Sequence, residues 1–281
     1  MMIANSVVDL LFAVNTMITM ASVCFGPQLV YVITDNPLYP KTYLASLIGI
    51  GSHLFLMFLS VSMLPLKFIY RYGVMRNRPF SNIQLFGMFM VSFMLGALHG
   101  GACPFTFTPR SAYYDEILKK SLENPNAVVN GYLVGEVHEF NAMAMHFSNV
   151  FVIMAISYTF IILMIYLSKQ TVTLQKNEMM TKQTAAVQRQ ITRIIYFQAL
   201  YPVFVIGFPC LLFPIFVVQG KTVPYIGEWA MFSMHTPPLV NSLAVILCVP
   251  SYRRFVVHPF KSSRIDTSVM PAQSVVDFGR Q

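Results

Sequence analysis

The residues best suited to chemistry in this chain are polar side chains at one end of long apolar runs. Four histidines, one glutamate and one tryptophan lie in or near such ends. A small-ligand pocket is apolar with a few converging polar groups. We therefore predict six pocket candidates: His53, His99, Glu139, His146, Trp229 and His235. The alternative for any single histidine is a hydrogen bond to a neighbouring helix.

Other kinds of site lack their sequence patterns. The four cysteines form no CxxC and no Cys/His spacing of a structural metal site, so neither a metal nor another cofactor is expected. No Ser/His/Asp set, HExxH or phosphate-binding glycine loop is present, so an enzyme is not predicted. The Lys and Arg residues lie in short loops rather than in one stripe with aromatics, so nucleic-acid binding is not predicted either.

Basic side chains gather at the opposite ends of the apolar runs. Arg71 stands between Tyr70 and Tyr72, and Arg189 and Arg193 are four residues apart, which puts them on one face of a helix. The pair Arg253 and Arg254 follows the last apolar run. The two arginine pairs either contact the acidic surface of a partner or bind anionic lipid head groups. For Arg71 the alternative to a functional role is a topogenic charge at the interface, with Tyr70 and Tyr72 as interfacial belt residues.

Composition shows what must position these residues. The chain is 56% hydrophobic and 11% charged, where soluble domains carry roughly 25% charged residues. A helix needs about 20 apolar residues to cross a bilayer, and in lipid its backbone bonds are satisfied internally. The sequence predicts six spans, at residues 6–33, 43–68, 83–104, 142–167, 194–218 and 229–249. Pro202, Pro209 and Pro214 are expected to bend the fifth, as packing kinks or as a hinge.

The distribution of basic residues predicts the orientation of the spans. Of the 19 Lys and Arg residues, 14 fall in the loops after spans two and four and in the C-terminal tail, and 5 in the opposite loops. Cytoplasmic loops carry the excess of Lys and Arg. We expect both termini in the cytoplasm, a helical bundle over residues 1–260, and a disordered tail over residues 261–281.

Three ordered motifs resemble one receptor family. The second span ends in Lys67-Phe68-Ile69-Tyr70-Arg71-Tyr72, and a Gln/Lys-rich stretch, residues 182–190, leads into Gln198-Ala199-Leu200-Tyr201-Pro202. The run Val249-Pro250-Ser251-Tyr252-Arg253-Arg254 follows the last span. Together they resemble the nematode serpentine-type G-protein-coupled chemoreceptors, of class delta or of the related Str class.

The resemblance implies an all-α, rhodopsin-like transmembrane bundle in the plasma membrane, with about six helices present and the family's first helix missing. It implies a small odorant-like or pheromone-like ligand between the outer helix halves, and a heterotrimeric G protein at the cytoplasmic face. Arg71, with Tyr70 and Tyr72, would be the switch at that face. Arg189, Arg193, Arg253 and Arg254 would add contacts to the G protein.

Three further expectations qualify the resemblance. Many such receptors tie the third helix to an outer loop by a disulfide; here Cys24 and Cys103 are the candidates, and the alternative is two free cysteines packed as small apolar side chains. No Lys lies between Trp229 and Val249, which excludes a retinal Schiff base there. Asp9, about one turn into the first span, is expected to reach the membrane surface rather than lie buried.

Two other functions remain open from the sequence. A non-signalling, truncated receptor paralogue would share all three motifs. A six-span transporter or channel is disfavoured, because the span centres hold almost no charge and the two halves show no repeat.

Overall fold

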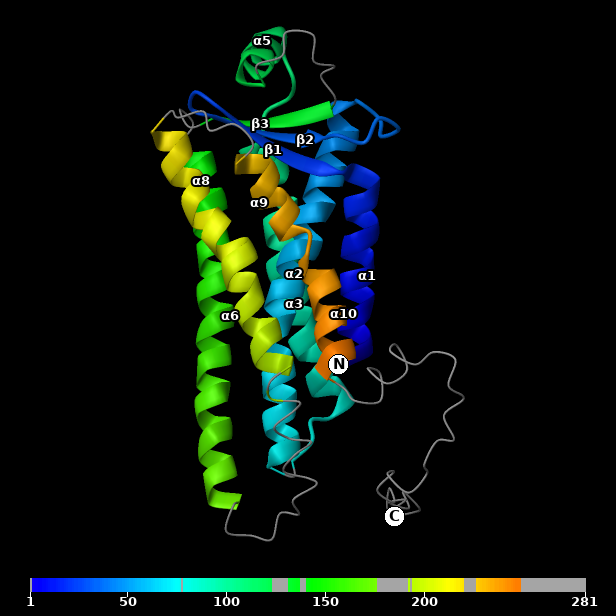
Figure 1. Ribbon diagram of the computed structural model, residues 1–281, viewed down its shortest axis with the longest axis vertical. Coiled ribbons are helices and arrows are strands. Elements are labelled where there is room, and N and C mark those ends of the chain that lie inside the picture. The colour runs from blue at the N-terminus through cyan, green and yellow to red at the C-terminus, as the bar shows by residue number, and fades with distance from the viewer. Residues whose placement is uncertain are drawn as a thin grey trace.

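The computed structural model of the protein describes residues 2–76, 78–122, 131–136, 140–175, 192, 194–219 and 226–248. It is mainly helical, which confirms the predicted fold class, and the helices run side by side (Figure 1). Within the described residues, four helices are long and apolar enough to cross a membrane: Tyr43–Met75, Asn82–Thr106, Ala142–Thr171 and Ile194–Phe213. The apolar helix at the start of the chain, Ile3–Thr19, is shorter.

The first predicted span, residues 6–33, is wrong in its second half. Helix α1 covers Met2–Thr19, and the chain then forms two antiparallel strands, β1 (Ala21–Gly26) and β2 (Leu29–Thr34). Strand β2 is rich in β-branched and aromatic residues, which favour a pleated, half-buried surface, whereas β1 contributes Val23 and Phe25. The tight turn between the two strands holds Gln28 with a positive φ of 59°. Hydropathy alone does not distinguish such strands from helix.

Helix α2 (Tyr43–Met75) is the central element of the bundle and packs against α1, α3 and α6. Thr42 caps its start by accepting a hydrogen bond from the backbone N–H of Ala45. The helix runs seven residues beyond the predicted end of span two, so Lys67 and Arg71 lie within its last turns and not in a loop. Their side chains are therefore positioned by helical geometry.

Helix α3 (Asn82–Gly101), followed by the short α4 (Cys103–Thr106), lies unusually close to α2. A Cβ atom at Gly100 would approach the backbone oxygen of Gly51 to 2.6 Å and Cβ of Phe55 to 2.8 Å. Small residues allow transmembrane helices this approach. Glycine at position 100 thus sets the α2–α3 distance.

Helix α6 (Phe140–Gln175) is the longest and exposes apolar side chains along one side. The next helical segment starts at residue 194 and continues through Pro202 into a π-helical turn, η1 (Val203–Gly207), and then α8 (Phe208–Val218). The predicted bend at Pro202 thus takes the form of a local widening of the helix. π-Turns often mark functional sites in helices.

The last predicted span is two helices, α9 (Ile226–Met234) and α10 (Pro237–Cys248). The break between them precedes Pro237 and Pro238, because a residue before proline is pushed out of the helical region. His235 lies at this break.

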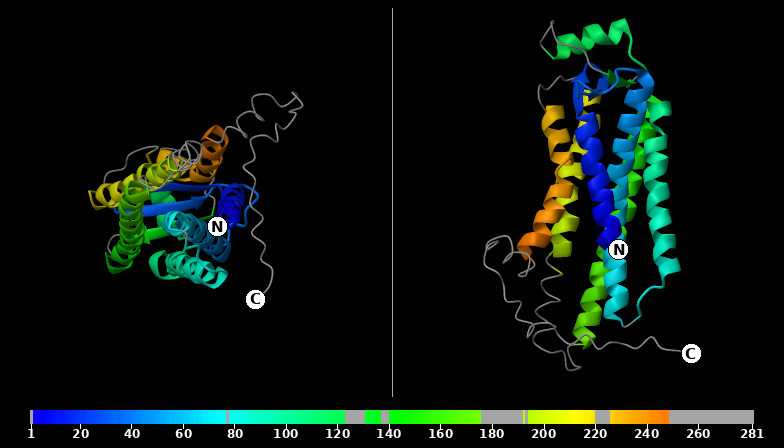
Figure 2. Two further views of the ribbon diagram at one scale, coloured as in Figure 1. Left: turned by 90° about the horizontal axis from the view of Figure 1, so that it is seen from below. Right: turned by 90° about the vertical axis from the view of Figure 1, so that its right-hand side faces the viewer.

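A third strand, β3 (Gly131–Glu136), pairs antiparallel with β2, giving the order β1-β2-β3. Helix α5 (Ala112–Ser121) lies across this sheet at one end of the bundle, which we name the sheet end (Figure 2). The end that carries the α2–α3 turn is named the turn end. The sheet was not predicted from the sequence.

Candidate functional site

A cavity lies directly under the sheet, and we name it the sheet cavity. It holds about 700 Å³ of space free of atoms, part of it continuous with the outside. Strands β1 and β2 contribute its roof, and α2, α6, α8 and α9 contribute walls. The lining residues are Val23, Val30, Val32, Ile50, His53, Leu54, Met57, Phe58, Phe107, Met143, His146, Phe147, Val150, Cys210, Phe213, Met231 and Met234. Among the described residues, no lining side chain carries a formal charge, and the two histidines are the only lining side chains with a nitrogen atom.

His53 forms one polar edge of the sheet cavity. Its ring is 1% exposed and packs against two other rings, Phe12 at 5.0 Å and His235 at 4.9 Å between centroids. Within the described residues, neither nitrogen of His53 has a hydrogen-bond partner, nor does Nε2 of His235. A buried polar atom without a partner carries a free-energy cost that a ligand can relieve.

His146 lies on the α6 wall of the same cavity and is backed by His99 of α3. Their ring centroids are 4.5 Å apart, and Phe58 and Phe107 pack on His99 and His146 at 4.3 Å and 5.6 Å respectively. Nδ1 of His146 and both nitrogens of His99 have no partner in the described part of the chain. Each cavity histidine is therefore the front member of a buried imidazole pair.

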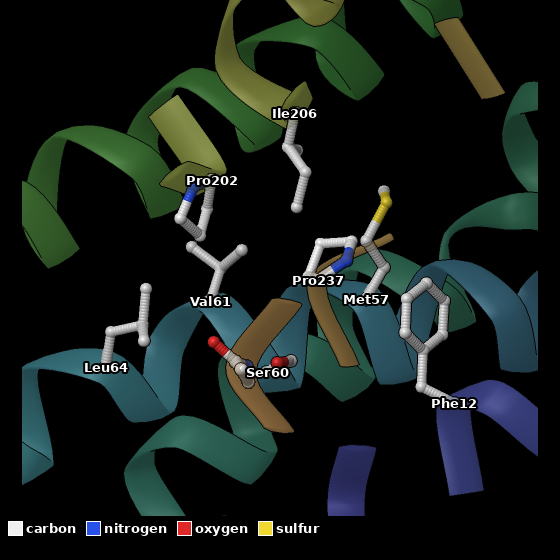
Figure 3. Close-up of a pocket in the computed structure, with 9 residues that line it drawn as sticks. Phe12, Met57, Ser60, Val61, Leu64, Pro202, Ile206 and Pro237 are labelled. Atoms are coloured by element: carbon white, nitrogen blue, oxygen red, sulfur yellow. The ribbon is translucent and has the colours of Figure 1, made fainter. Parts of the chain in front are cut away.

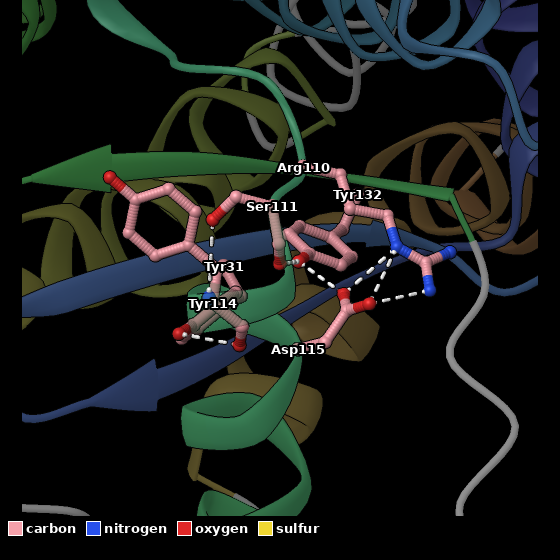
Figure 4. A network of polar contacts seen from close by, with 6 residues as sticks. All are labelled: Tyr31, Arg110, Ser111, Tyr114, Asp115 and Tyr132. Carbon is pink, nitrogen blue, oxygen red and sulfur yellow. Dashed lines mark hydrogen bonds and ion pairs between the residues drawn. The ribbon is translucent and has the colours of Figure 1, made fainter.

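The roof of the cavity is fastened by polar contacts between α5 and the sheet (Figure 4). Arg110 forms a bidentate ion pair with the Asp115 carboxylate, in which Nε and Nη2 donate at 2.8 Å and 2.7 Å. The Tyr132 hydroxyl of β3 donates to the same carboxylate at 2.5 Å. The Tyr31 hydroxyl of β2 donates to the Tyr114 carbonyl at 3.2 Å. We name this group the roof latch.

The electrostatics of the roof latch favour an ionised Asp115. Partial burial by itself raises the pKa of this carboxyl, but hydrogen bonds from Arg110 and Tyr132 outweigh burial, and the resulting pKa is below its ordinary value. The pKa of Tyr132 is raised, first by burial and then by its hydrogen bond to Asp115. At neutral pH the latch therefore consists of a carboxylate, a guanidinium and a protonated phenol.

A second cluster lies deeper in the bundle, around Asp9 of α1. Its carboxylate accepts hydrogen bonds from Asn5 Nδ2 at 2.8 Å, from Ser60 Oγ at 3.1 Å and from Asn241 Nδ2 at 3.2 Å. Asp9 is 8% exposed, so the expectation that it reaches the membrane surface is wrong. The helix faces α2 and α10 instead of lipid at this position, and three polar side chains replace the water that the carboxylate loses.

A smaller cavity adjoins this cluster (Figure 3). It holds about 270 Å³ of space free of atoms between α1, α2, η1 and α10. Ser60 and Asn241 supply its polar lining, and Pro202, Ile206 and Pro237 lie around it. Loose packing thus occurs where the helix bends at Pro202 and where α9 breaks from α10.

Arg71 lies at the turn end of α2 and is directed inward. Its Nη2 donates to the Thr192 hydroxyl, while Tyr70 is 38% exposed and points away. Tyr72 interacts with Arg76, through a 3.2 Å hydrogen bond and a guanidinium 5.8 Å from the ring centroid. Of these three adjacent residues, Arg71 is the one placed between helices.

The amino-acid sequence shows which family this bundle belongs to. The model described as serpentine type 7TM GPCR chemoreceptor Str matches residues 1–257. The chain belongs to the Str family of serpentine chemoreceptors. Of the two classes that the motifs suggested, Str is therefore confirmed, and this Str receptor is a multi-pass membrane protein of a G-protein-coupled receptor family.

Other comparisons add little to this assignment. Among solved structures, squid rhodopsin is similar with 12% sequence identity and a TM-score of 0.45, over 78% of this chain and 61% of the squid chain. The Str receptor thus spans less than two thirds of that structure. No curated protein matches the sequence.

The Str receptor brings four of the six pocket candidates together. His53 and His146 line the sheet cavity, and His99 and His235 lie directly behind them. Trp229 does not line it: α9 directs Met231 and Met234 inward, and Trp229 is 70% exposed on the other side of that helix. The sixth candidate, Glu139, lies outside the described residues.

Of the two alternatives for Cys24 and Cys103, a disulfide or two free cysteines, the structure has the second. Successive side chains of a strand alternate between its faces. Since Val23 faces the cavity, Cys24 faces α5, whereas Cys103 is buried against Ile50 of α2 below the sheet. Burial, followed by the nearby Glu228 carboxylate, raises the pKa of Cys24 to about 11, so its thiol stays protonated at neutral pH.

The remaining basic candidates, Arg189, Arg193, Arg253 and Arg254, lie outside the described residues, as does the tail over residues 261–281. Sequence reasoning missed the residues of the roof, above all Val23, Val30 and Val32. A signal for them was available: the turn residues Gly26-Pro27-Gln28 are followed by Leu29–Thr34, a run of mostly β-branched residues that is typical of a strand.

Proposed function

We propose that this Str receptor binds a small, uncharged and mostly apolar ligand in the sheet cavity. The observation that supports this most is the pairing of an apolar lining with unpartnered nitrogens on His53 and His146. A neutral imidazole can donate through one nitrogen and accept through the other. A ligand with one or two hydrogen-bonding groups would satisfy these nitrogens, and its apolar body would fill the rest of the cavity.

The charge of the lining argues against ionic ligands. Among the described lining residues, an amine entering the cavity would find no carboxylate, and a permanent anion would find no Lys or Arg. A buried charge without a partner is strongly disfavoured. The cavity therefore favours alcohols, carbonyl compounds or similar neutral molecules over their charged analogues.

The proposed neutral ligand is tested by measuring ligand-stimulated nucleotide exchange. The assay uses membranes that contain the receptor and a heterotrimeric G protein. A panel with one carbon skeleton, carrying a hydroxyl, a carbonyl, an ammonium or a sulfonate, is expected to activate through its neutral members. His53→Phe or His146→Phe should weaken the response about two- to tenfold, since each lost hydrogen bond contributes about 0.5–1.5 kcal/mol. Trp229→Phe is the matched control and should leave the response unchanged.

Activation by the charged members alone would overturn the assignment of an uncharged ligand. An unchanged response in both histidine variants would move the ligand out of the sheet cavity.

We further propose that the receptor acts at the plasma membrane, with the turn end in the cytoplasm and Arg71 contacting the G protein when the helices open. The distribution of Lys and Arg supports this orientation. Arg71→Ala should reduce stimulated exchange at least tenfold while ligand affinity stays within about twofold. Exposed Tyr70, changed to Phe, is the control. Tags at Met1 and Gln281 detected on opposite faces of the membrane would contradict the orientation.

A further inference from the structure

Two groups of opposite charge lie within the turn-end half of the bundle. Asp9 is buried on α1, and Lys67 is partly buried on α2, one turn before Arg71. They form no direct ion pair: the only salt bridge between described residues joins Arg110 and Asp115. Charges inside a membrane protein are costly and are usually paired or functional.

A chain of hydrogen bonds connects the two charges. The Lys67 ammonium donates to Gln198 Oε1 at 3.4 Å, and Gln198 Nε2 donates to the backbone oxygen of Asn241 at 3.2 Å. Asn241 Nδ2 then donates to the Asp9 carboxylate at 3.2 Å. Gln198 and Asn241 are 7% and 6% exposed. The chain runs from α2 through the helix that starts at residue 194 to α10 and α1.

The direction of these bonds fits the two charges. Gln198 accepts from the Lys67 ammonium and donates to the backbone oxygen of Asn241, and the side-chain amide of Asn241 donates to the Asp9 carboxylate. All three donors are therefore directed from the Lys67 side toward Asp9, which is the orientation that the field between a cation and an anion favours.

From this arrangement we propose that Asp9 and Lys67 are a counter-ion pair, bridged by Gln198 and Asn241, that holds the turn end of the bundle closed. The inference rests on the proposed receptor function for its consequence in signalling, but the pair itself does not depend on that function.

The helix that carries Gln198 is the element best placed to break the bridge. Four residues beyond Gln198 it reaches Pro202, and the π-turn η1 follows, beside the smaller cavity. An outward swing about this bend would remove Gln198 from both Lys67 and Asn241. The two charges would then be left inside the bundle without their connection, so the closed arrangement is the more populated one.

A stability cycle tests the pair without ligand or G protein. The full-length receptor in detergent is compared with Asp9→Asn, Lys67→Met and the double variant. Each single change leaves one buried charge uncompensated and should lower Tm, whereas the double variant should be more stable than the sum of the single effects predicts. Ser242→Ala is the matched control, because this exposed hydroxyl of α10 bonds only the Pro238 carbonyl of its own helix. Additive losses would overturn the counter-ion pair.

A distance measurement tests closure. Spin labels at Val74 and Phe197, both exposed, report the separation of the turn ends of α2 and the helix starting at residue 194, in a background lacking the native cysteines. Gln198→Leu and the double variant should shift the population to longer distances and raise basal nucleotide exchange about fivefold or more. Unchanged distances would overturn the role in closure. Longer distances without any exchange would count instead against the proposed G-protein function.

Discussion

At the scale of single residues, the polar groups of the Str receptor differ in whether their hydrogen bonds are satisfied. His53 and His146, which face the sheet cavity, have ring nitrogens without hydrogen-bond partners in the described part of the chain, whereas Asp9 and Asp115 each accept from several donors. A buried acceptor that already has its donors is structural, and one that lacks them is open to a ligand. This contrast separates binding candidates from structural groups more sharply than residue type does.

The roof latch gives a prediction at this scale. Asp115→Asn should loosen α5 and increase hydrogen exchange of its backbone amides about two- to fivefold, the range expected for a mostly solvated ion pair. Because hydrogen bonds lower the pKa of Asp115 in the folded protein, the latch is fully stabilising above the ordinary carboxyl pKa of about 3.9 and is lost as pH falls through the lower folded value. Exposed Glu116, changed to Gln on the same helix, is the control. Equal exchange in both variants would argue against the latch.

At the scale of elements, the sequence predicted most helices and missed the sheet. Long apolar runs with few charges identified α2, α3 and α6, because only helix satisfies a backbone in lipid over such lengths. The strands were read as helix because Ala21–Gly26 and Leu29–Thr34 continue the apolar run of α1. Strand pairing with β3 depends on a segment about 100 residues away, which local hydropathy does not report.

The contact between α2 and α3 gives the prediction at this scale. Gly100→Ala should destabilise the receptor by about 1–3 kcal/mol, because the new methyl group meets the Gly51 carbonyl and Phe55 at less than contact distance. Gly101→Ala, whose Cβ would meet nothing within 4 Å, should be nearly neutral. Tm measurements in detergent compare the two. A similar Tm for both variants would mean that α3 shifts without cost.

At the scale of the whole molecule, the sequence predicted the family of this chain better than it predicted the candidate site. The three ordered motifs were sufficient to indicate the serpentine chemoreceptors, because each is a local pattern, but they left class delta or Str open, and the family match shows Str. Of the cavity, the sequence indicated His53 and His146 but not their pairing with His235 and His99, which needs the packing of α2, α3 and α6. Trp229 was misplaced because depth along a span does not give the face of a helix.

The order of strands in the roof has a consequence for biosynthesis. The hairpin of β1 and β2 leaves the ribosome before β3, but β2 is the middle strand of the sheet. The hydrogen bond from the Thr34 hydroxyl to the Gly131 carbonyl, 97 residues later in the chain, therefore forms only after β3 has been made. Until β3 is translated and delivered to the same side of the membrane, the hairpin keeps an open edge that any other strand can occupy. Chaperones of that compartment would therefore meet the nascent receptor at this edge.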